Sequence, residues 1–157
     1  MTTAAAGGVL IVGYGNGLRS DDGVGPVVAA SLAADPRLRG AEVLAAHQLT
    51  PELAFDASGA SLLVLVDAAA DVPAGEIAVR GLDPGGVTGG EPMTHHTDPA
   101  GIVGLAAELF GAAPRVVIVS VGAASLDLGD GLSPAVAAAV PRAVEAVLAA
   151  IEAHRDA

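Results

Sequence analysis

Cysteine and lysine are both missing from this chain of 157 residues, and each absence removes a class of chemistry. Without cysteine, the protein has no disulfide, no thiolate metal site and no cysteine nucleophile. Without lysine, it has no Walker loop, because that phosphate-binding motif requires a lysine after its glycine. Aromatic residues are also scarce, at 2% of the chain against 52% for hydrophobic residues as a whole. The core therefore has to be built from Ala, Val, Leu and Ile.

Positive charge is the next shortage. Seven arginines face 18 acidic residues, which gives a formal net charge of −11. Proteins that bind nucleic acids rely on basic contacts to phosphates, and anionic membranes attract basic segments. The charge therefore argues against both partners. It fits a polar or basic partner better, although acidity also keeps many proteins soluble.

Long apolar runs are missing as well. No uninterrupted run reaches the roughly 18 residues that a membrane-spanning helix needs, and the longest candidate, residues 134–151, contains Pro141, Arg142 and Glu145. Near the N-terminus, an apolar run follows a segment without basic residues and leads into a glycine turn, which is typical of a first strand rather than a signal peptide. We therefore expect a cytoplasmic protein that has no membrane partner.

The segments that are present include five short stretches with the composition of strands. They are residues 8–14, 41–49, 61–68, 75–82 and 115–122. The first, third and fifth are continuously apolar, which is typical of central strands covered on both faces. The fourth alternates between apolar and polar residues and is predicted to be an edge strand.

The segments between the strands are predicted helices, over residues 25–38, 50–58, 97–111 and 132–155. The last three begin with a capping residue followed by proline, and the predicted caps are Thr50, Asp98 or Thr97, and Ser133. Pro141 is expected to kink the last helix. Alternating strands and helices predict an α/β fold. We expect a single domain over residues 1–157, with a mainly parallel twisted sheet of about five strands and helices on both faces.

The stretch VGYGNGLRSDDGVG, residues 12–25, places closely spaced glycines at the end of the first predicted strand. A dinucleotide-binding turn begins in the same way but needs a third glycine for close helix–strand packing, and Leu18 stands at that position. Asp21 and Asp22 follow, and their charges would repel a phosphate that no lysine is present to hold. We therefore interpret the stretch as a glycine turn that presents a carboxylate.

Candidate metal ligands fall where the predicted strands end, which is the edge where α/β folds bind ligands. Asp21 and Asp22 follow the first strand, Asp67 ends the third, and His95 and His96 precede the third helix. Two carboxylates and one imidazole suit Zn²⁺ or Ni²⁺ with coordination positions left open. Each residue also has an ordinary structural explanation, since a strand-end aspartate often caps a loop and adjacent aspartates cannot both point inward. The residues alone leave open which aspartate and which histidine take part.

The motifs of the chain resemble those of the [NiFe]-hydrogenase maturation proteases, the endopeptidases that trim the C-terminus of the hydrogenase large subunit. The most specific is the pattern G-x-G-N-x-L-x-x-D-[DE]-G-x-G, which residues 13–25 match. The stretches HQLTPELA, LLVLVDA, MTHHTDPAGIVGLA and VGAASLDLGDGLSPAV follow in the family's order. The resemblance covers most of the chain and implies an α/β sheet flanked by helices, with a site that recognises a metal.

By motif position, the resemblance implies Asp22, Asp67 and His95 as metal ligands, with Asp22 and Asp67 also as the catalytic carboxylates. Asp22 is selected because the second acidic residue of the D-[DE]-G turn is the family's ligand. His95 directly follows Thr94 and has the better register, and His96 is the alternative. The implied metal is nickel, supplied by the hydrogenase large-subunit precursor that is the expected partner. The free enzyme is accordingly expected to bind no metal, or to bind it weakly.

The resulting hypothesis is an endopeptidase that removes the C-terminal extension of the precursor after recognising its nickel. The alternatives are a stand-alone metallohydrolase with its own zinc and a chaperone that holds the precursor without cutting it. Asn16 is expected to order the glycine turn through side-chain-to-backbone hydrogen bonds. Residues 125–131 are expected to lie along the same edge, where Asp127 and Asp130 either receive a basic peptide or are solvated.

Overall fold

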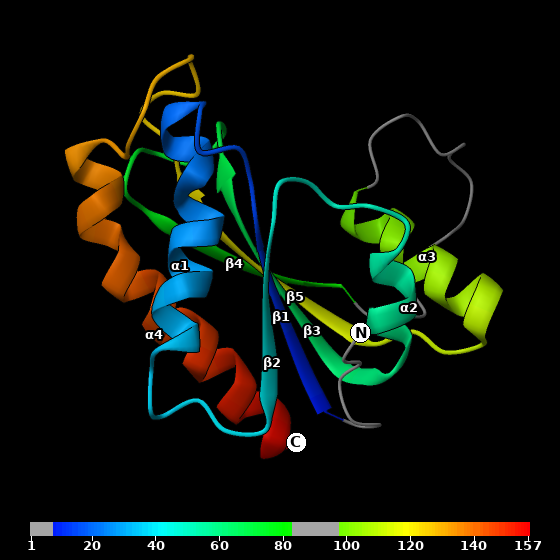
Figure 1. The fold of residues 1–157 in the computed structure, drawn as a ribbon. Coiled ribbons are helices and arrows are strands. Elements are labelled where there is room, and N and C mark those ends of the chain that lie inside the picture. Colours follow the sequence, from blue (N-terminus) through cyan, green and yellow to red (C-terminus); the bar gives the residue numbers. More distant parts are fainter. Residues whose placement is uncertain (1–7, 83–97) are drawn as a thin grey trace.

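The computed structural model of the protein describes residues 8–82 and 98–157, and Figure 1 shows its arrangement. The strands are β1 (Gly8–Tyr14), β2 (Ala41–Ala46), β3 (Ala60–Ala69), β4 (Ile77–Leu82) and β5 (Arg115–Gly122). The helices are the 3₁₀ helix η1 (Ser20–Gly23), α1 (Val24–Ala33), α2 (Leu53–Ser58), α3 (Pro99–Phe110) and α4 (Pro134–Arg155).

The five strands form one sheet in the order β2-β1-β3-β5-β4. The pairs β1–β2, β1–β3 and β3–β5 are parallel, and β4 runs antiparallel to β5 at the edge. The prediction of an α/β fold with a mainly parallel sheet of about five strands is confirmed, and so is the edge position of the fourth strand. The three continuously apolar segments are the three central strands, as their composition predicts.

Helices cover both faces of the sheet, with α1 and α4 on one face and α2 and α3 on the other (Figure 1). Side chains alternate along each strand, so Val9 and Ile11 pack toward α1 and α4, whereas Leu10 and Val12 pack on the opposite face. Each fully buried Val, Leu or Ile contributes roughly 1.5–3 kcal/mol relative to an exposed one. A core without aromatic residues therefore gains its stability from many small aliphatic contacts.

Two of the three predicted helix caps are confirmed. The Asp98 carboxylate accepts a hydrogen bond from the Gly101 N–H at 2.7 Å, and the Ser133 hydroxyl accepts one from the Val136 N–H at 3.4 Å. Thr50 is not a cap, because α2 begins only at Leu53 with Glu52 before it. The chain first makes tight turns, in which the N–H groups of residues 53–55 bond the carbonyls three residues earlier.

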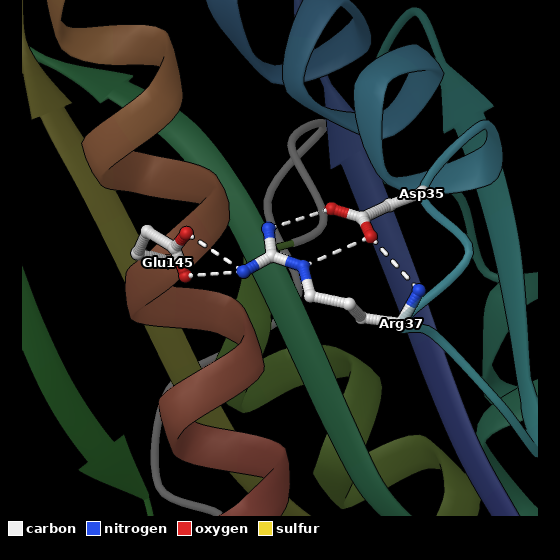
Figure 2. Close-up of polar contacts among 3 residues, drawn as sticks. All are labelled: Asp35, Arg37 and Glu145. Carbon is white, nitrogen blue, oxygen red and sulfur yellow. Dashed lines mark hydrogen bonds and ion pairs between the residues drawn. The ribbon is translucent and has the colours of Figure 1, made fainter.

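Helix α1 and strand β2 are both shorter than predicted. Helix α1 ends at Ala33, because Pro36 disfavours helical backbone at Asp35, whose carboxylate instead accepts a hydrogen bond from the N–H of Arg37 at 2.9 Å. Figure 2 shows the Arg37 side chain bridging Asp35 and Glu145, with N···O distances of 2.8 Å to each. Strand β2 ends at Ala46, since the last backbone hydrogen bond runs from the Gly15 N–H to the Ala46 carbonyl.

Helix α4 is the one helix in the described ranges that is long and apolar enough to cross a membrane by length and composition. It packs on the sheet, and its buried residues belong to the core: Val136, Ala139, Ala143, Val144, Val147 and Ile151. The helix continues through Pro141, which is exposed. The apolar composition of α4 is therefore explained by its place in the core.

Candidate functional site

Three polar side chains meet where the central strands end. Asp67 of β3 pairs directly with Ser120 of β5. Tyr14 follows Gly13, which is the last residue of β1 that pairs with β3. The Tyr14 hydroxyl donates to Asp67 Oδ2 at 2.9 Å, and the Ser120 hydroxyl donates to Asp67 Oδ1 at 2.6 Å. By the alternation of the strands, all three lie on the face covered by α2 and α3. Asp67 is thus held from both neighbouring strands.

The environment of Asp67 disfavours its charged form. Burial raises the pKa of Asp67 above its ordinary value, and the nearby charge of Asp22 adds to that effect. The hydrogen bonds from Ser120 and Tyr14 and the charge of Arg80 act in the opposite direction. Burial, followed by the charge of Asp67, also raises the pKa of Tyr14, so the phenol stays protonated and remains a donor.

Asp22 lies in η1 and closes the glycine turn. Its Oδ2 accepts a hydrogen bond from the Asn16 N–H at 2.8 Å, and the Asn16 side-chain oxygen accepts one from the Leu18 N–H at 2.9 Å. The prediction that Asn16 orders the turn is confirmed. A Cβ at Gly15 would stand 1.8 Å from the Asp22 carbonyl oxygen, so only glycine permits this close approach.

The start of α1 fixes where η1 lies. A Cβ on Gly25 would stand 2.4 Å from the Tyr14 carbonyl oxygen and 2.6 Å from that of Val66, which immediately precedes Asp67. Helix α1 therefore begins directly against the ends of β1 and β3. Asp22 precedes Gly25 by three residues and also contacts the Gly15–Asn16 backbone, so Asp22 and Asp67 both lie at the carboxyl edge of the sheet.

Asp21 has a different role from its neighbour. It is 0% exposed, and its carboxylate accepts hydrogen bonds from the N–H groups of Ala124, Ser125 and Ser133 at 2.7–3.0 Å and from the Ser133 hydroxyl at 2.9 Å. Burial raises the pKa of Asp21, but these hydrogen bonds outweigh burial and hold the pKa below its ordinary value. Asp21 thus joins the glycine turn to the start of α4, and the two adjacent aspartates point to different surroundings.

The loop of residues 125–131 lies along the glycine turn, as predicted. Arg19 and Gly129 form a parallel β-bridge, in which the Ser20 N–H bonds the Gly129 carbonyl and the Gly129 N–H bonds the Leu18 carbonyl, each at 3.0 Å. The Ser20 hydroxyl also donates to the Asp127 carbonyl at 2.9 Å. Ser20 has a φ of 54°, a strained value for a residue other than glycine. The three hydrogen bonds hold it there.

His95 and His96 lie outside the described residues, as does Thr94. The chain re-enters the description at Asp98, the cap of α3, and α3 runs back toward the start of β5 (Figure 1). Within residues 8–82 and 98–157, no three His, Cys, Asp or Glu side chains gather in a group that could hold a metal ion. The structure thus brings Asp22 and Asp67 to one edge, and the imidazole ligand stays a prediction.

Tyr14 and Ser120 are contacts of Asp67 that reasoning from the sequence missed. A signal for both was present, since Tyr14 is the only tyrosine of the chain and Ser120 interrupts a continuously apolar strand. Aligning the ends of the three central strands places a polar residue at the end of each. The alignment requires the strand register, which the sequence does not state.

Several solved structures that share this fold are hydrogenase maturation enzymes. A hydrogenase 2 maturation peptidase from a Thaumarchaeota archaeon is 25% identical, with 92% of this chain and 97% of that chain covered and a TM-score of 0.71. The hydrogenase-maturating endopeptidase HybD from E. coli is 26% identical, with 93% of each chain covered and a TM-score of 0.71. The [NiFe] hydrogenase maturation protease HycI from Thermococcus kodakarensis shares the fold at 24% identity, with 88% of each chain covered and a TM-score of 0.66. Neither a protein-family model nor a curated protein matches the sequence.

Proposed function

We propose that this chain belongs to the hydrogenase maturation endopeptidases. On that premise, it removes the C-terminal extension of a [NiFe]-hydrogenase large-subunit precursor. The observation that carries the proposal is the similarity to two maturation peptidases, which extends over more than nine-tenths of this chain and of each of those two proteins. The absence of cysteine is compatible with a peptidase that does not use a thiol. The proposed location is the cytoplasm.

The proposed recognition element is the nickel ion that the precursor carries. Asp22, Asp67 and His95 would each offer one ligand to it, and nickel accepts such a set of carboxylate and imidazole donors. Only one oxygen of Asp22 is used in a hydrogen bond among the described residues, and each oxygen of Asp67 accepts one bond and keeps a further lone pair. Carboxylates of this kind are available to a metal that arrives with the substrate.

Two ways of activating the cleavage are compatible with this edge. The substrate's nickel would polarise the scissile carbonyl or lower the pKa of a bound water, or Asp22 or Asp67 would act as a general base. In either case the roles of the surrounding residues are the same. Tyr14 and Ser120 hold the Asp67 carboxylate in one orientation, and Asn16 does so for Asp22.

The decisive experiment compares a nickel-loaded precursor with a nickel-free one, each incubated with the purified protein. Mass spectrometry is expected to show a shortened partner only for the loaded form. Cleavage of both forms at the same rate would refute recognition through nickel. A stable complex without any shortening would identify a chaperone, and close to one equivalent of zinc in protein purified without added metal would identify a stand-alone metallohydrolase.

Three single substitutions test the residues assigned to the site. Asp22→Ala, Asp67→Ala and His95→Ala are each expected to lower cleavage of the loaded precursor by at least about 100-fold, because each removes a ligand or a base. Circular dichroism confirms that the variants are folded. Full activity of a folded Asp67→Ala protein would mean that the carboxylate set is wrong, and full activity of His95→Ala would transfer the role to His96.

A further inference from the structure

Two leucines stand in solvent beside the candidate site. Leu18 is 67% exposed and Leu128 is 78% exposed. A single exposed leucine on a protein surface needs no explanation. These two come from segments 110 residues apart in the chain, yet the fold places them together. Their shared position therefore calls for a reason in the structure.

Backbone hydrogen bonds hold the two leucines next to each other. The bridge between Arg19 and Gly129 is parallel, and the Gly129 N–H bonds the Leu18 carbonyl at 3.0 Å. Leu18 and Leu128 each precede a bridge partner by one residue, so they occupy the same register. Paired segments lie about 5 Å apart. The bridge thus places two exposed leucines on neighbouring, ordered segments, and together they make an apolar surface.

This surface is continuous with the carboxylate edge. The Leu18 N–H bonds the Asn16 side chain, and the Asn16 N–H bonds Asp22 Oδ2, so two hydrogen bonds separate the leucine from the candidate ligand. Asp127 and Asp130, on either side of Leu128 in the chain, are exposed, and neither takes part in the ion pairs of the described residues. The apolar surface is therefore flanked by two exposed carboxylates and one exposed guanidinium, that of Arg19, which leaves a net negative charge.

We propose that Leu18, Leu128, Asp127 and Asp130, here called the leucine rim, form the docking surface for the precursor, and that it takes an apolar side chain flanked by basic residues. Charge complementarity selects a basic segment over an acidic one. Continuity with Asp22 places the docked segment beside the bond to be cut. The inference rests on the proposed function, in which recognition of the metal does not by itself select the side chains that lie next to it in the precursor.

The test measures binding and cleavage of the nickel-loaded precursor by the wild type, by Leu128→Ser and by the double variant Leu18→Ser/Leu128→Ser. Losing the apolar contacts is expected to weaken the precursor Kd about fivefold in the single variant and about 30-fold in the double one. The loss is expected in KM and not in kcat, because the rim binds and does not react. Leu128→Ser keeps the test valid if the double variant fails to fold, since the Leu128 side chain is 78% exposed.

The charged part of the rim has its own variant, Asp127→Asn/Asp130→Asn. It is expected to slow association several-fold at low salt, and the difference from the wild type is expected to vanish at about 0.5 M salt, where surface charges are screened. Matched controls lie elsewhere on the surface: Leu109→Ser replaces a leucine that is 62% exposed on α3, and Asp156→Asn replaces an exposed aspartate after α4. Both controls are expected to bind and cleave as the wild type does.

Each outcome decides between the docking proposal and the function on which it rests. If the wild type cleaves the precursor and the rim variants bind it as tightly, the docking proposal is wrong and the proposed function stands. If the wild type binds without cleaving, the rim variants still decide the docking. If the wild type neither binds nor cleaves, both proposals fall. If the wild type is a dimer that the leucine variants convert to a monomer, the rim is an interface with a second copy and the docking proposal fails.

Discussion

The two ends of the central strands differ in how many hydrogen-bond donors they offer to carboxylates. At the carboxyl end, Asp21 is 0% exposed and accepts four hydrogen bonds, and Asp67 accepts two. Toward the amino end, Asp56 is 8% exposed, and its Oδ1 has no hydrogen-bond partner within the described ranges. Glu42, whose Oε2 is also buried there with no partner among the residues that the structure describes, adds its charge. The comparison teaches that the number of donors decides whether a carboxylate away from water holds its charge, since the four donors to Asp21 outweigh burial and the two donors to Asp67 do not.

The pKa values of these groups move accordingly. Hydrogen bonds outweigh burial and hold the pKa of Asp21 below its ordinary value. Burial, followed by the charge of Glu42, raises the pKa of Asp56. Ionised Asp21 therefore contributes stability above its unfolded pKa, which is lost as the pH falls through the folded one. The contribution of Asp56 to stability has the opposite sign, because its ionisation above the unfolded pKa, roughly 3.9, costs stability.

The largest expected effect removes the packing that creates the carboxyl end. Gly25→Ala would place a Cβ 2.4 Å from one backbone carbonyl oxygen and 2.6 Å from another, and neither can move without displacing β1 or β3. We expect a loss of about 4 kcal/mol or more in the free energy of unfolding, measured by denaturant titration. Gly17→Ala is the matched control in the same turn, because a Cβ there has nothing within 4 Å. Equal stability of the two variants would contradict the close approach of α1.

The next largest effect separates the adjacent aspartates. Asp21→Ala leaves the buried donors of Ala124, Ser125 and Ser133 without an acceptor, and we expect it to lower the free energy of unfolding by about 3 kcal/mol at pH 7. The difference from the wild type should shrink as the pH falls below about 4, where the carboxylate of the unfolded chain is protonated. Denaturant titrations at several pH values measure both.

Asp22→Ala is the control for that experiment. It removes one hydrogen bond, from Asn16, and is expected to cost about 1 kcal/mol or less while lowering cleavage strongly. If the two substitutions destabilised the protein equally, the division of the pair into a structural and a site residue would be wrong.

A smaller effect of opposite sign is expected near the amino end. Asp56→Asn removes a buried charge next to Glu42 and should raise the free energy of unfolding by about 1 kcal/mol at pH 7. Because the wild type loses stability as the pH rises above its unfolded pKa, the advantage of the variant should disappear below about pH 4. Thermal unfolding at pH 3.5 and pH 7 measures this, and a destabilised variant at pH 7 would show that Asp56 has a stabilising partner.

The smallest effect concerns the ion pairs at the surface. Arg37 and Glu145 are 55% and 60% exposed in their side chains (Figure 2). The side-chain hydrogen bonds that Arg37 donates to Asp35, followed by the one from its backbone N–H, lower the pKa of Asp35 to about 2. Exposed pairs add little to stability and are screened by salt. Arg37→Ala should therefore be detectable only at low salt in thermal unfolding, and a large loss at 0.5 M salt would show that the bridge anchors α1 to α4.

Much of the fold could be predicted from the sequence because its signals are local. Continuous apolar runs identify the three central strands, and Asp98 and Ser133 mark the starts of two helices through side-chain caps close by in the chain. The predicted start of α2 at Thr50 was wrong, because the turns before α2 satisfy the backbone hydrogen bonds without a side-chain cap. The predicted ends of β2 and α1 were wrong, because β2 stops where its pairing with β1 ends and Pro36 stops α1. These boundaries depend on neighbours that a local pattern does not include.

The candidate site was predictable only in part, for a similar reason. Asp67 and the glycine turn are visible as motifs, and the expectation that the two adjacent aspartates would not both face the site agrees with their separate surroundings. Leu18 stands where a dinucleotide-binding turn has its third glycine. The structure shows that Gly25, seven residues later, provides the close helix–strand approach that such a glycine supplies. The spacing differs because η1 is inserted between the turn and the helix.

The sequence by itself determined the order of strands and helices, the aliphatic core, and a carboxylate-bearing turn at the end of the first strand, because each follows from residues adjacent in the chain. Only the tertiary structure decided that Tyr14 and Ser120, each 53 residues from Asp67, hold its two oxygens, and that Asp21 turns inward while Asp22 closes the turn. Such partners are set by strand register and by the packing of α1 on β1 and β3. Both arise from contacts between distant segments, so no short stretch of the chain encodes them.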